Sequence, residues 1–312
     1  MRLREFRRPD FPRFFALLRS EFPEEEAMLG MRPEGMETIV RRLYRPDLRI
    51  FLGLLRAVHR SPFHLYVMEE DGAVAGTTML SFTPRTGFLS TVVVAPEFRR
   101  RGVARQLIEA ARREAAARRR PYVALRVLAD NAPARALYAA AGYQTLDQQS
   151  FLVHEEPAAL AQAPEAREIR PFRSSDGEAL AEIANRANPP TVREVLPVEA
   201  REMVPGRWAD RVFLAETAAW VVDRGNGPEA HVAASATPLT EAAHLSAPVV
   251  GPSVEPSVAA GLVRTAGAWL AARHPARIVT SIADDHLPGR RALEEAGFHA
   301  GMAHYTLYRS SG

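Results

Sequence analysis

The chain has 312 residues, 47% of them hydrophobic and 25% charged, which suits two globular domains and excludes an intrinsically disordered protein. Its net charge of +3 is too small for a nucleic-acid-binding surface, and the absence of cysteine excludes disulfides, thiolate metal sites and a cysteine nucleophile. No run approaches the ~20 apolar residues that cross a bilayer, and the N-terminus lacks the apolar segment of a secretory signal. We therefore expect a cytoplasmic protein with no metal that binds neither nucleic acid nor a membrane.

The 40 basic residues are all arginine, and they are unevenly distributed. Residues 1–156 contain 25 arginines and 19 acidic residues, whereas residues 157–312 contain 15 and 18. The first half is therefore positively charged and the second negatively charged. An anionic ligand is expected to prefer the first half, and the absence of lysine excludes Schiff-base chemistry.

The first half shows alternating strand and helix patterns. The Asp71–Gly72 dipeptide predicts a hairpin turn between strands over Phe63–Glu69 and Val74–Ser81. The elements predicted after it are a strand over Phe88–Val94, an amphipathic helix from Gly102 to about Arg118, a strand over Tyr122–Leu128 and a short helix over Pro133–Ala141. This order predicts an α/β sandwich with mixed strand directions.

The two halves begin and end alike, which indicates a duplication. Residues 3–10 read LREFRRPD and residues 169–176 read IRPFRSSD, while ALYAAAGY at 136–143 corresponds to ALEEAGF at 292–298. We therefore predict two domains, 1–156 and 168–312, joined by an Ala/Pro/Glu-rich linker at 157–167.

The segment from Val92 to Arg105, VVVAPEFRRRGVAR, predicts an anion site. A strand ends at a proline, an arginine-rich turn follows, and Gly102 begins a helix. The first turn of a helix has unpaired N–H groups and the positive end of the helix dipole, and a glycine lets a phosphate approach the backbone.

Two motifs in the first half carry a family resemblance. The pattern R99-x-x-G102-x-A104 after a V-x-x-P strand resembles the Q/R-x-x-G-x-G/A signature of the GCN5-related N-acetyltransferase (GNAT) family, and the second motif, from Asn131 to Tyr143, reads NxxAxxLYxxxGY. The resemblance covers about residues 1–154 and recurs in degraded form in 168–312. It implies two tandem GNAT-like domains, each a mixed, mostly antiparallel sheet flanked by helices.

The resemblance also implies a reaction, the transfer of an acetyl group from acetyl-CoA to the primary amine of a small molecule or peptide. Tyr138, whose phenol is protonated at neutral pH, would return a proton to the leaving thiolate. Asn131 would either cap its helix or contact the cofactor. The implied acetyl-CoA contacts are Val92, Val93, Val94, Arg99, Arg100, Arg101, Gly102, Val103, Ala104, Arg105 and Asn131.

The general base is missing from the strand before the loop, which offers only Ser90 and Thr91. Residues 21–63 form a longer connection than is usual in the family, with helical spacing at 34–44 and 47–58 that could roof an acceptor pocket. The candidates for a general base in or just after this segment are the carboxylates Glu24, Glu25, Glu26 and Glu37 and the histidines His59 and His64. Residues in such positions are more typically solvated or structural.

The second copy is expected to be catalytically inactive. Aligning Pro252 with Pro96 places Glu255 at the Arg99 position and Val258 at the Gly102 position. Counting back from the closing glycines places Leu293 at the Tyr138 position. Two alternatives remain: a non-catalytic acyl-CoA-binding regulatory protein, and a mycothiol synthase-like acetyltransferase, in which the C-terminal copy is the active one.

Overall fold

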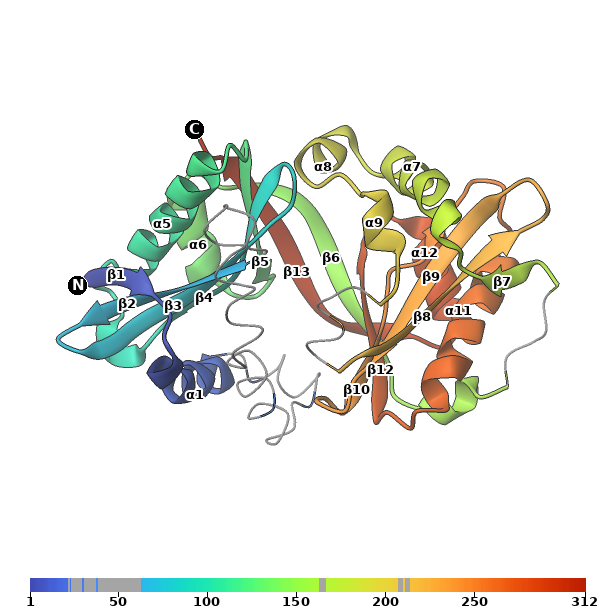
Figure 1. Ribbon diagram of the computed structural model, residues 1–312, viewed down its shortest axis with the longest axis horizontal. Helices are drawn as coiled ribbons and strands as arrows, with labels where there is room; N and C mark the ends of the chain where they lie inside the picture. Colours follow the sequence, from blue (N-terminus) through green and yellow to red (C-terminus); the bar gives the residue numbers. More distant parts are fainter. Residues whose placement is uncertain are drawn as a thin grey trace.

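A single continuous sheet runs through both halves of the protein. The structure, a computed structural model, describes residues 1–21, 23, 30, 38, 63–162, 167–206, 210 and 214–312. Within these residues thirteen strands form one sheet in the order β1-β2-β3-β4-β5-β13-β6-β12-β10-β9-β8-β7, with β11 paired to β9 (Figure 1). The helices predicted at 34–44 and 47–58, with the carboxylates and His59 of that segment, lie outside the described residues.

The elements of the first half agree with the sequence prediction, and the hairpin turn at Asp71 and Gly72 has positive φ at both residues. They are β1 (Arg2–Glu5), η1 (Arg8–Asp10), α1 (Phe11–Glu21), β2 (Phe63–Glu70), β3 (Ala73–Phe82), β4 (Thr86–Val94), η2 (Pro96–Phe98), α5 (Val103–Ala117), β5 (Tyr122–Leu128), α6 (Ala132–Ala140) and β6 (Gln144–His154).

The second half repeats this plan after a short turn. Its elements are η3 (Pro157–Leu160), β7 (Ile169–Pro171), η4 (Ser174–Asp176), α7 (Gly177–Ala187), α8 (Pro190–Val195), α9 (Ala200–Met203), β8 (Glu216–Asp223), β9 (Pro228–Ala236), β10 (Ala242–Leu245), β11 (Val249–Val250), α11 (Pro256–Ala271), β12 (Arg277–Ala283), α12 (Leu287–Glu295) and β13 (His299–Ser310). No helix among the described residues is long and apolar enough to cross a membrane.

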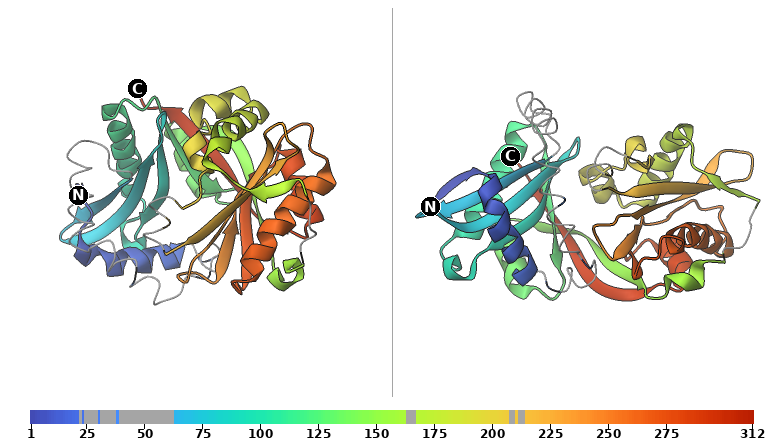
Figure 2. Two further views of the ribbon diagram at one scale, coloured as in Figure 1. Left: turned by 45° about the vertical axis from the view of Figure 1, so that its right-hand side comes forward. Right: turned by 60° about the horizontal axis from the view of Figure 1, so that its bottom comes forward.

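The two halves exchange their last strands. Strand β13, at the end of the chain, lies between β5 and β6, and β6 continues into the second half, where it pairs with β12. Both views in Figure 2 show β6 and β13 side by side between the halves, with the C-terminus returned to the first half. Strand pairing therefore crosses the predicted boundary between residues 1–156 and 168–312.

Each half has its own hydrophobic core under its own pair of helices. In the first, α5 and α6 cover a cluster that includes Leu89, Leu125 and Leu307, so the exchanged strand completes the core. In the second, α11 and α12 cover a cluster that includes Leu152 of β6 in the same way. Burying a leucine side chain is worth about 1.5–3 kcal/mol, so each half depends on the other for part of its stability.

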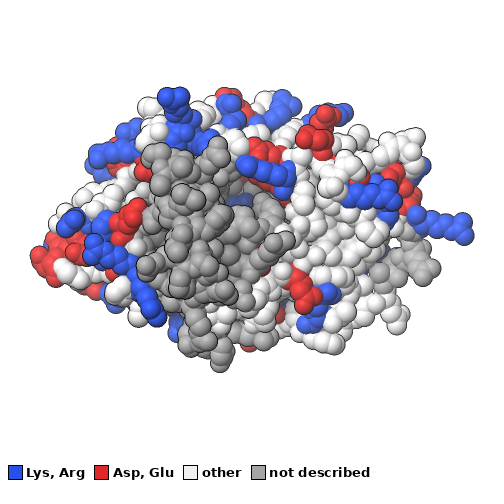
Figure 3. Space-filling model, in the orientation of Figure 1, with Lys and Arg blue, Asp and Glu red and all other residues white. Residues whose placement is uncertain are grey.

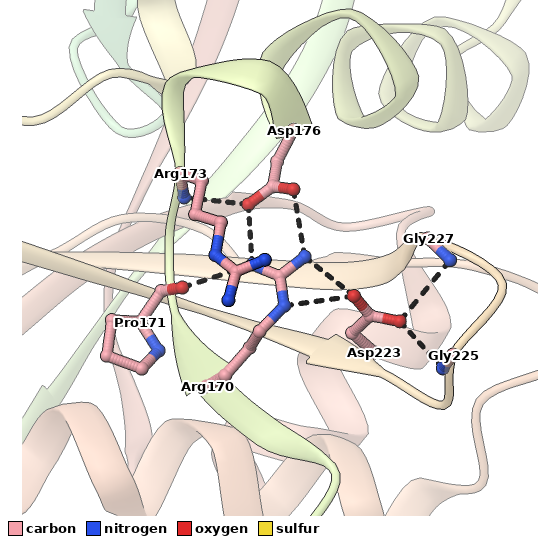
Figure 4. A network of polar contacts seen from close by, with 7 residues as sticks. All are labelled: Arg170, Pro171, Arg173, Asp176, Asp223, Gly225 and Gly227. Carbon is pink, nitrogen blue, oxygen red and sulfur yellow. Dashed lines mark hydrogen bonds and ion pairs between the residues drawn. The ribbon is translucent and has the colours of Figure 1, made fainter.

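A buried ion network near the start of each half supports the duplication. Arg170 contacts both oxygens of Asp176 at 2.8 and 2.9 Å and also pairs with Asp223 at 2.7 Å (Figure 4). Arg4 makes the same paired contact with Asp10, at 2.7 and 2.8 Å, and its third partner is Glu69. The shared R-x-F-R-x-x-D pattern thus places an arginine and an aspartate at matching positions of the two halves.

The Asp176→Asn variant is expected to lower the free energy of unfolding by about 1.5–3 kcal/mol at pH 7, because Arg170 loses a charged hydrogen-bond partner. The hydrogen bond from Arg170 lowers the pKa of Asp176, against the opposing effect of burial. Its contribution is therefore present above the unfolded pKa of ~3.9 and is lost as pH falls through the lower folded value.

Urea unfolding at pH 7 and at acid pH checks this prediction. Glu182→Gln is the control, since Glu182 pairs with Arg186 on the exposed face of the adjacent helix α7 and should contribute at most about 0.5 kcal/mol. Equal stability of wild type and Asp176→Asn at pH 7 would contradict the network's role.

Candidate active site

Strands β4 and β5 diverge, which creates the opening around which the site is built. They pair in parallel only over Thr86–Leu89 and Tyr122–Leu125. The register of β4 against β3 then shifts at Ser90, which marks a bulge, and β4 continues along β3 while β5 continues along β13. The backbone groups of β4 that would face β5 beyond Leu89 therefore have no partner in that strand.

The Val92–Val94 stretch lies along this opening, with side chains directed to alternate faces. Val92 and Val94 pack near Val103 on the α5 side, and Val93 packs on Leu17 of α1. The side chains are thus used in packing on both faces, which leaves the backbone as the part of this strand that can bind a ligand.

Helix α5 begins directly after the arginine-rich turn, and its N-terminus is uncapped. The N-cap residue is Gly102, with no side-chain cap, and the amide of Gln106 donates to the Gly102 carbonyl. The amides of Val103, Ala104 and Arg105 precede that bond and have no acceptor within the helix. This end of the helix can therefore bind an anion through its N–H groups and its dipole.

The backbone geometry keeps the helix N-terminus open. Gly102 has φ +80°, and a β-carbon added there would meet nothing within 4 Å. Arg100 has φ +62°, which is strained for a residue with a side chain and costs about 1–3 kcal/mol. Gly76 of β3 lets α5 approach, since a β-carbon there would come within 2.9 Å of Val103. Sequence reasoning missed Gly76, although a glycine inside a strand is a signal of close packing.

Two of the four arginines around the helix N-terminus have acidic partners. Arg99 pairs with Glu21 of α1, and Arg101 pairs with Glu70 at 2.9 Å. Both arginine side chains are about half exposed, so these are weak surface pairs that an incoming phosphate can displace.

Arg100 and Arg105 make no ion pair among the described residues. Arg105 lines a surface cavity of about 550 Å³ together with Gln106 and with Ala140 and Ala141 at the end of α6. A ligand bound at the start of α5 can therefore extend between α5 and α6. On the face drawn in Figure 3, the arginines of the first half are interspersed with acidic side chains.

Tyr138 lies on α6, beneath the opening between the strands. Tyr138 belongs to the same hydrophobic cluster as Leu89 and Val127, and Val92 packs against that cluster. The ring of Tyr138 meets the ring of Tyr143 edge-to-face, with 5.8 Å between the ring centres. Burial raises the pKa of Tyr138 to about 12, so its phenol is protonated at neutral pH. The structure thus places Tyr138 and Val92 at the same hydrophobic cluster.

Asn131 caps helix α6, because its Oδ1 accepts from the amide of Ala134 at 3.1 Å. Of the two roles left open for this residue, capping is confirmed, and a cofactor contact through its free amide nitrogen stays a prediction. His64 is buried against Arg118, which agrees with its predicted structural role.

The second half has a different loop from the one the sequence alignment suggested. Helix α11 begins at Pro256, and its N-cap residue is Glu255. Because Gly102 is the N-cap of α5, Glu255 is the residue that corresponds to Gly102. The prediction that Val258 takes this position was therefore wrong by three residues. The loop is shorter, and a carboxylate paired with Arg224 occupies the helix N-terminus. Pro256 also removes one of its amide donors.

The end of the second repeat confirms the other proposed equivalence. His286 caps α12 by accepting from Gly289, as Asn131 caps α6. Seven residues after each cap stand Tyr138 and Leu293, both buried. The second half therefore has a leucine where the first has its phenol.

The fold and the site define an α/β protein of two repeats, with an anion site at a helix N-terminus beside two diverging parallel strands. Residues 12–143 match the model of the acetyltransferase (GNAT) family. A curated relative, mycothiol acetyltransferase from Thermobifida fusca (strain YX), is 37% identical over 141 residues, which cover 38% of this chain and 42% of that relative. The chain thus matches less than half of that relative's length.

Solved structures of similar fold extend over both halves. A tandem GNAT protein from the clavulanic acid biosynthesis pathway is 17% identical, covers 100% of this chain and 98% of its own, and has a TM-score of 0.62. A GCN5-related N-acetyltransferase from Sphaerobacter thermophilus is 17% identical, covers 99% and 95%, and has a TM-score of 0.63. Residues 12–143 thus match the GNAT family, and the fold of the whole chain is similar to that of a tandem GNAT protein.

Proposed function

We propose that the first half catalyses direct transfer of an acetyl group from acetyl-CoA to a primary amine. The observation that carries this proposal is the uncapped N-terminus of α5, with its open Gly102, beside the diverging strands β4 and β5. The N–H groups of Val103, Ala104 and Arg105, with the surrounding arginine side chains, would hold the pyrophosphate.

The acyl group would lie in the opening between the strands. Unpaired N–H groups of β4 near Val92–Val94 would stabilise the oxyanion that develops when the amine attacks the thioester carbon. The new N–C bond forms, the C–S bond breaks, and Tyr138 supplies a proton to the thiolate, whose conjugate thiol has a pKa of ~8.5. The acceptor begins as an ammonium group and ends as an amide, so its nitrogen loses two protons overall. One of them restores the proton that Tyr138 gave to the thiolate, and the other passes to solvent.

Two other functions are compatible with parts of this site. A regulatory protein that binds acyl-CoA without turnover would need the α5 loop but would have no use for Tyr138. A mycothiol synthase-like reaction is favoured by the similarity to the Thermobifida relative, but it would require the second half to be active. Release of CoA thiol from acetyl-CoA, measured over aminoglycosides, polyamines, amino acids and peptide N-termini, separates turnover from binding alone.

We further propose that the second half binds no acetyl-CoA, because Glu255 lies where Gly102 lies in the first. Calorimetric titration of the full chain is expected to give one acetyl-CoA per chain. The halves share strands, so the full chain is also the right protein for the control: Gly102→Glu, which blocks the first site, should bind none. A remaining site in that variant would show that the second half binds the cofactor.

A further inference from the structure

The opening between β4 and β5 has two faces. On the face covered by α5 and α6, Val92 packs against the cluster that contains Tyr138, and the proposed cofactor site begins at Gly102. We define the opposite face as the inner face of the sheet. With the cofactor on the helix side, the acceptor has to approach the thioester from the inner face.

The strand segments that border the opening carry no side chain that could take a proton from an ammonium group. Beyond Leu89, strand β4 reads STVVV, and beyond Leu125, strand β5 reads RVL. Yet an alkylammonium group with a pKa of ~10 is only about one part in a thousand neutral at pH 7. The electrostatic environment of the opening therefore decides how much of a bound acceptor can react.

Arg126 is placed at the inner mouth of this opening. It is the first residue of β5 beyond the stretch paired with β4. Its neighbours Leu125 and Val127 belong to the cluster under α5 and α6, so the side chain between them points to the inner face. The guanidinium lies 5.8 Å from the ring centre of Phe88, the residue of β4 just before Leu89. Arg126 therefore reaches from β5 toward β4 where the two strands begin to separate.

The charge of Arg126 is accessible and is not neutralised by a contact. The side chain is exposed, and it makes no ion pair among the described residues. Desolvation lowers the pKa of Arg126 and the charge of Asp147 on β6 opposes this, but a guanidinium stays charged in either case. Asp130, in the loop after β5, acts on His304. The inner mouth of the opening is therefore positively charged.

Two histidines show what this charge does to a basic nitrogen. His304 lies on β13 beside Leu128 of β5, and His244 lies on β10 of the second half. Desolvation and then the charge of Arg126 lower the pKa of His304 to about 4, and the same two causes lower the pKa of His244. Both imidazoles favour the neutral form, and an ammonium group beside Arg126 is subject to the same repulsion.

We propose that Arg126 keeps the nitrogen of the bound acceptor neutral, in place of a carboxylate base on β4. The ammonium group loses its first proton to solvent as it enters beside the guanidinium. The neutral nitrogen attacks the thioester carbon, the C–S bond breaks, and Tyr138 protonates the thiolate. The second proton of the nitrogen then restores Tyr138. This inference rests on the proposed acetyltransferase function.

The repulsion acts on the bound ammonium and not on the neutral amine, which fixes the kinetic signature of its loss. In Arg126→Gln the bound ammonium becomes more stable, so the pKa of the bound acceptor rises. Like charges about 6–8 Å apart shift a pKa by roughly 1–2 units at an effective dielectric constant of ~20. At pH 7, kcat and KM should therefore both fall roughly 10–100-fold, while kcat/KM changes less than about threefold.

The pH profile of kcat gives the sign independently. Because kcat reports the protonation of the bound complex, it should rise with pH as the acceptor becomes neutral. The midpoint of this rise should lie about 1–2 pH units higher in Arg126→Gln than in wild type. At a pH above both midpoints the variant should regain the kcat of wild type. A merely structural role would lower kcat at every pH.

Thiol release by the full chain, measured between about pH 6 and 10, tests the proposal with two amines. Propylamine should show the full effect of Arg126→Gln. Electron withdrawal by fluorine leaves 2,2,2-trifluoroethylamine largely neutral at pH 7, so its kcat should be nearly the same in wild type and variant. Arg126→Lys keeps the charge and should keep the wild-type profile. Arg186→Gln, at an exposed pair on α7, is the control and should change neither.

Three outcomes would overturn the proposal. They are an unchanged kcat profile in Arg126→Gln, which would place the base elsewhere, an equal loss for both amines at every pH, and acetyl-CoA binding with neither amine acetylated. Nuclear magnetic resonance titration of the imidazoles adds a measurement that needs no turnover. The pKa values of His304 and His244 should rise by roughly 0.5–1 unit in Arg126→Gln.

The titration also distinguishes failure of this inference from failure of the proposed function. A chain that does not bind acetyl-CoA in calorimetry refutes the acetyltransferase function, while raised imidazole pKa values in Arg126→Gln would still support the action of Arg126 at the opening. Unchanged imidazole pKa values would overturn the inference whether or not acetyl-CoA binds.

Discussion

Replacing Gly102 by glutamate is expected to abolish acetyl-CoA binding while the fold is retained. The new carboxylate would stand at the N-terminus of α5, where it would repel the pyrophosphate and occupy the free N–H groups. The space around Gly102 is open, so the side chain itself causes no clash. Calorimetry should show the loss of binding, and circular dichroism should show an unchanged spectrum.

The control for this variant must carry the same backbone strain, because φ at Gly102 is +80° and disfavours any side chain. Gly225→Glu meets that requirement: Gly225 has φ +99° and open space, and it lies in the β8–β9 turn of the second half (Figure 4). It should bind acetyl-CoA like wild type. Unchanged affinity in Gly102→Glu would remove the basis of the proposed donor site.

Tyr138→Phe is expected to lower kcat by roughly 10²–10⁴-fold with little change in acetyl-CoA affinity, because only the proton for the leaving thiolate is lost. The neighbouring Tyr143 is the matched control, since it is similarly buried and its hydroxyl has no hydrogen-bond partner among the described residues. Tyr143→Phe should keep near-normal turnover. Steady-state assays of thiol release compare the two variants.

The pH dependence gives a second check on Tyr138. Burial raises its pKa to about 12, so the phenol remains protonated throughout the range in which the protein is assayed. Loss of this proton therefore cannot produce a fall in kcat between pH 7 and 10. If Tyr138→Phe retains near-full turnover on a genuine acceptor, Tyr138 contributes only packing.

The exchange of β6 and β13 changes what the second half contributes. Leu307 of β13 completes the core of the first half. The catalytic domain predicted at residues 1–156 therefore has to include residues 299–310 as well. A second half that binds no cofactor would still be required for activity.

Local features of the site could be predicted from the sequence alone. The turn at Asp71 and Gly72, the strand that ends before Pro96, and the helix that begins after Gly102 depend on residues close together in the chain. Glycine, proline and the period of apolar residues act on their immediate neighbours, so their effect can be read without a fold. The duplication was recognisable for the same reason, because each repeat keeps its own short patterns.

The tertiary structure decided the features that join distant segments. Strands β6 and β13 would show the same alternation whichever half they paired with, since backbone hydrogen bonding is indifferent to the partner's sequence. The counterpart of Gly102 was misplaced because loop length, and not residue type, sets where α11 begins. Arg126, Thr306 and Asp147 are directly paired neighbours on β5, β13 and β6, although 180 positions separate Arg126 from Thr306 in the sequence. Only the order of the strands brings these three side chains together.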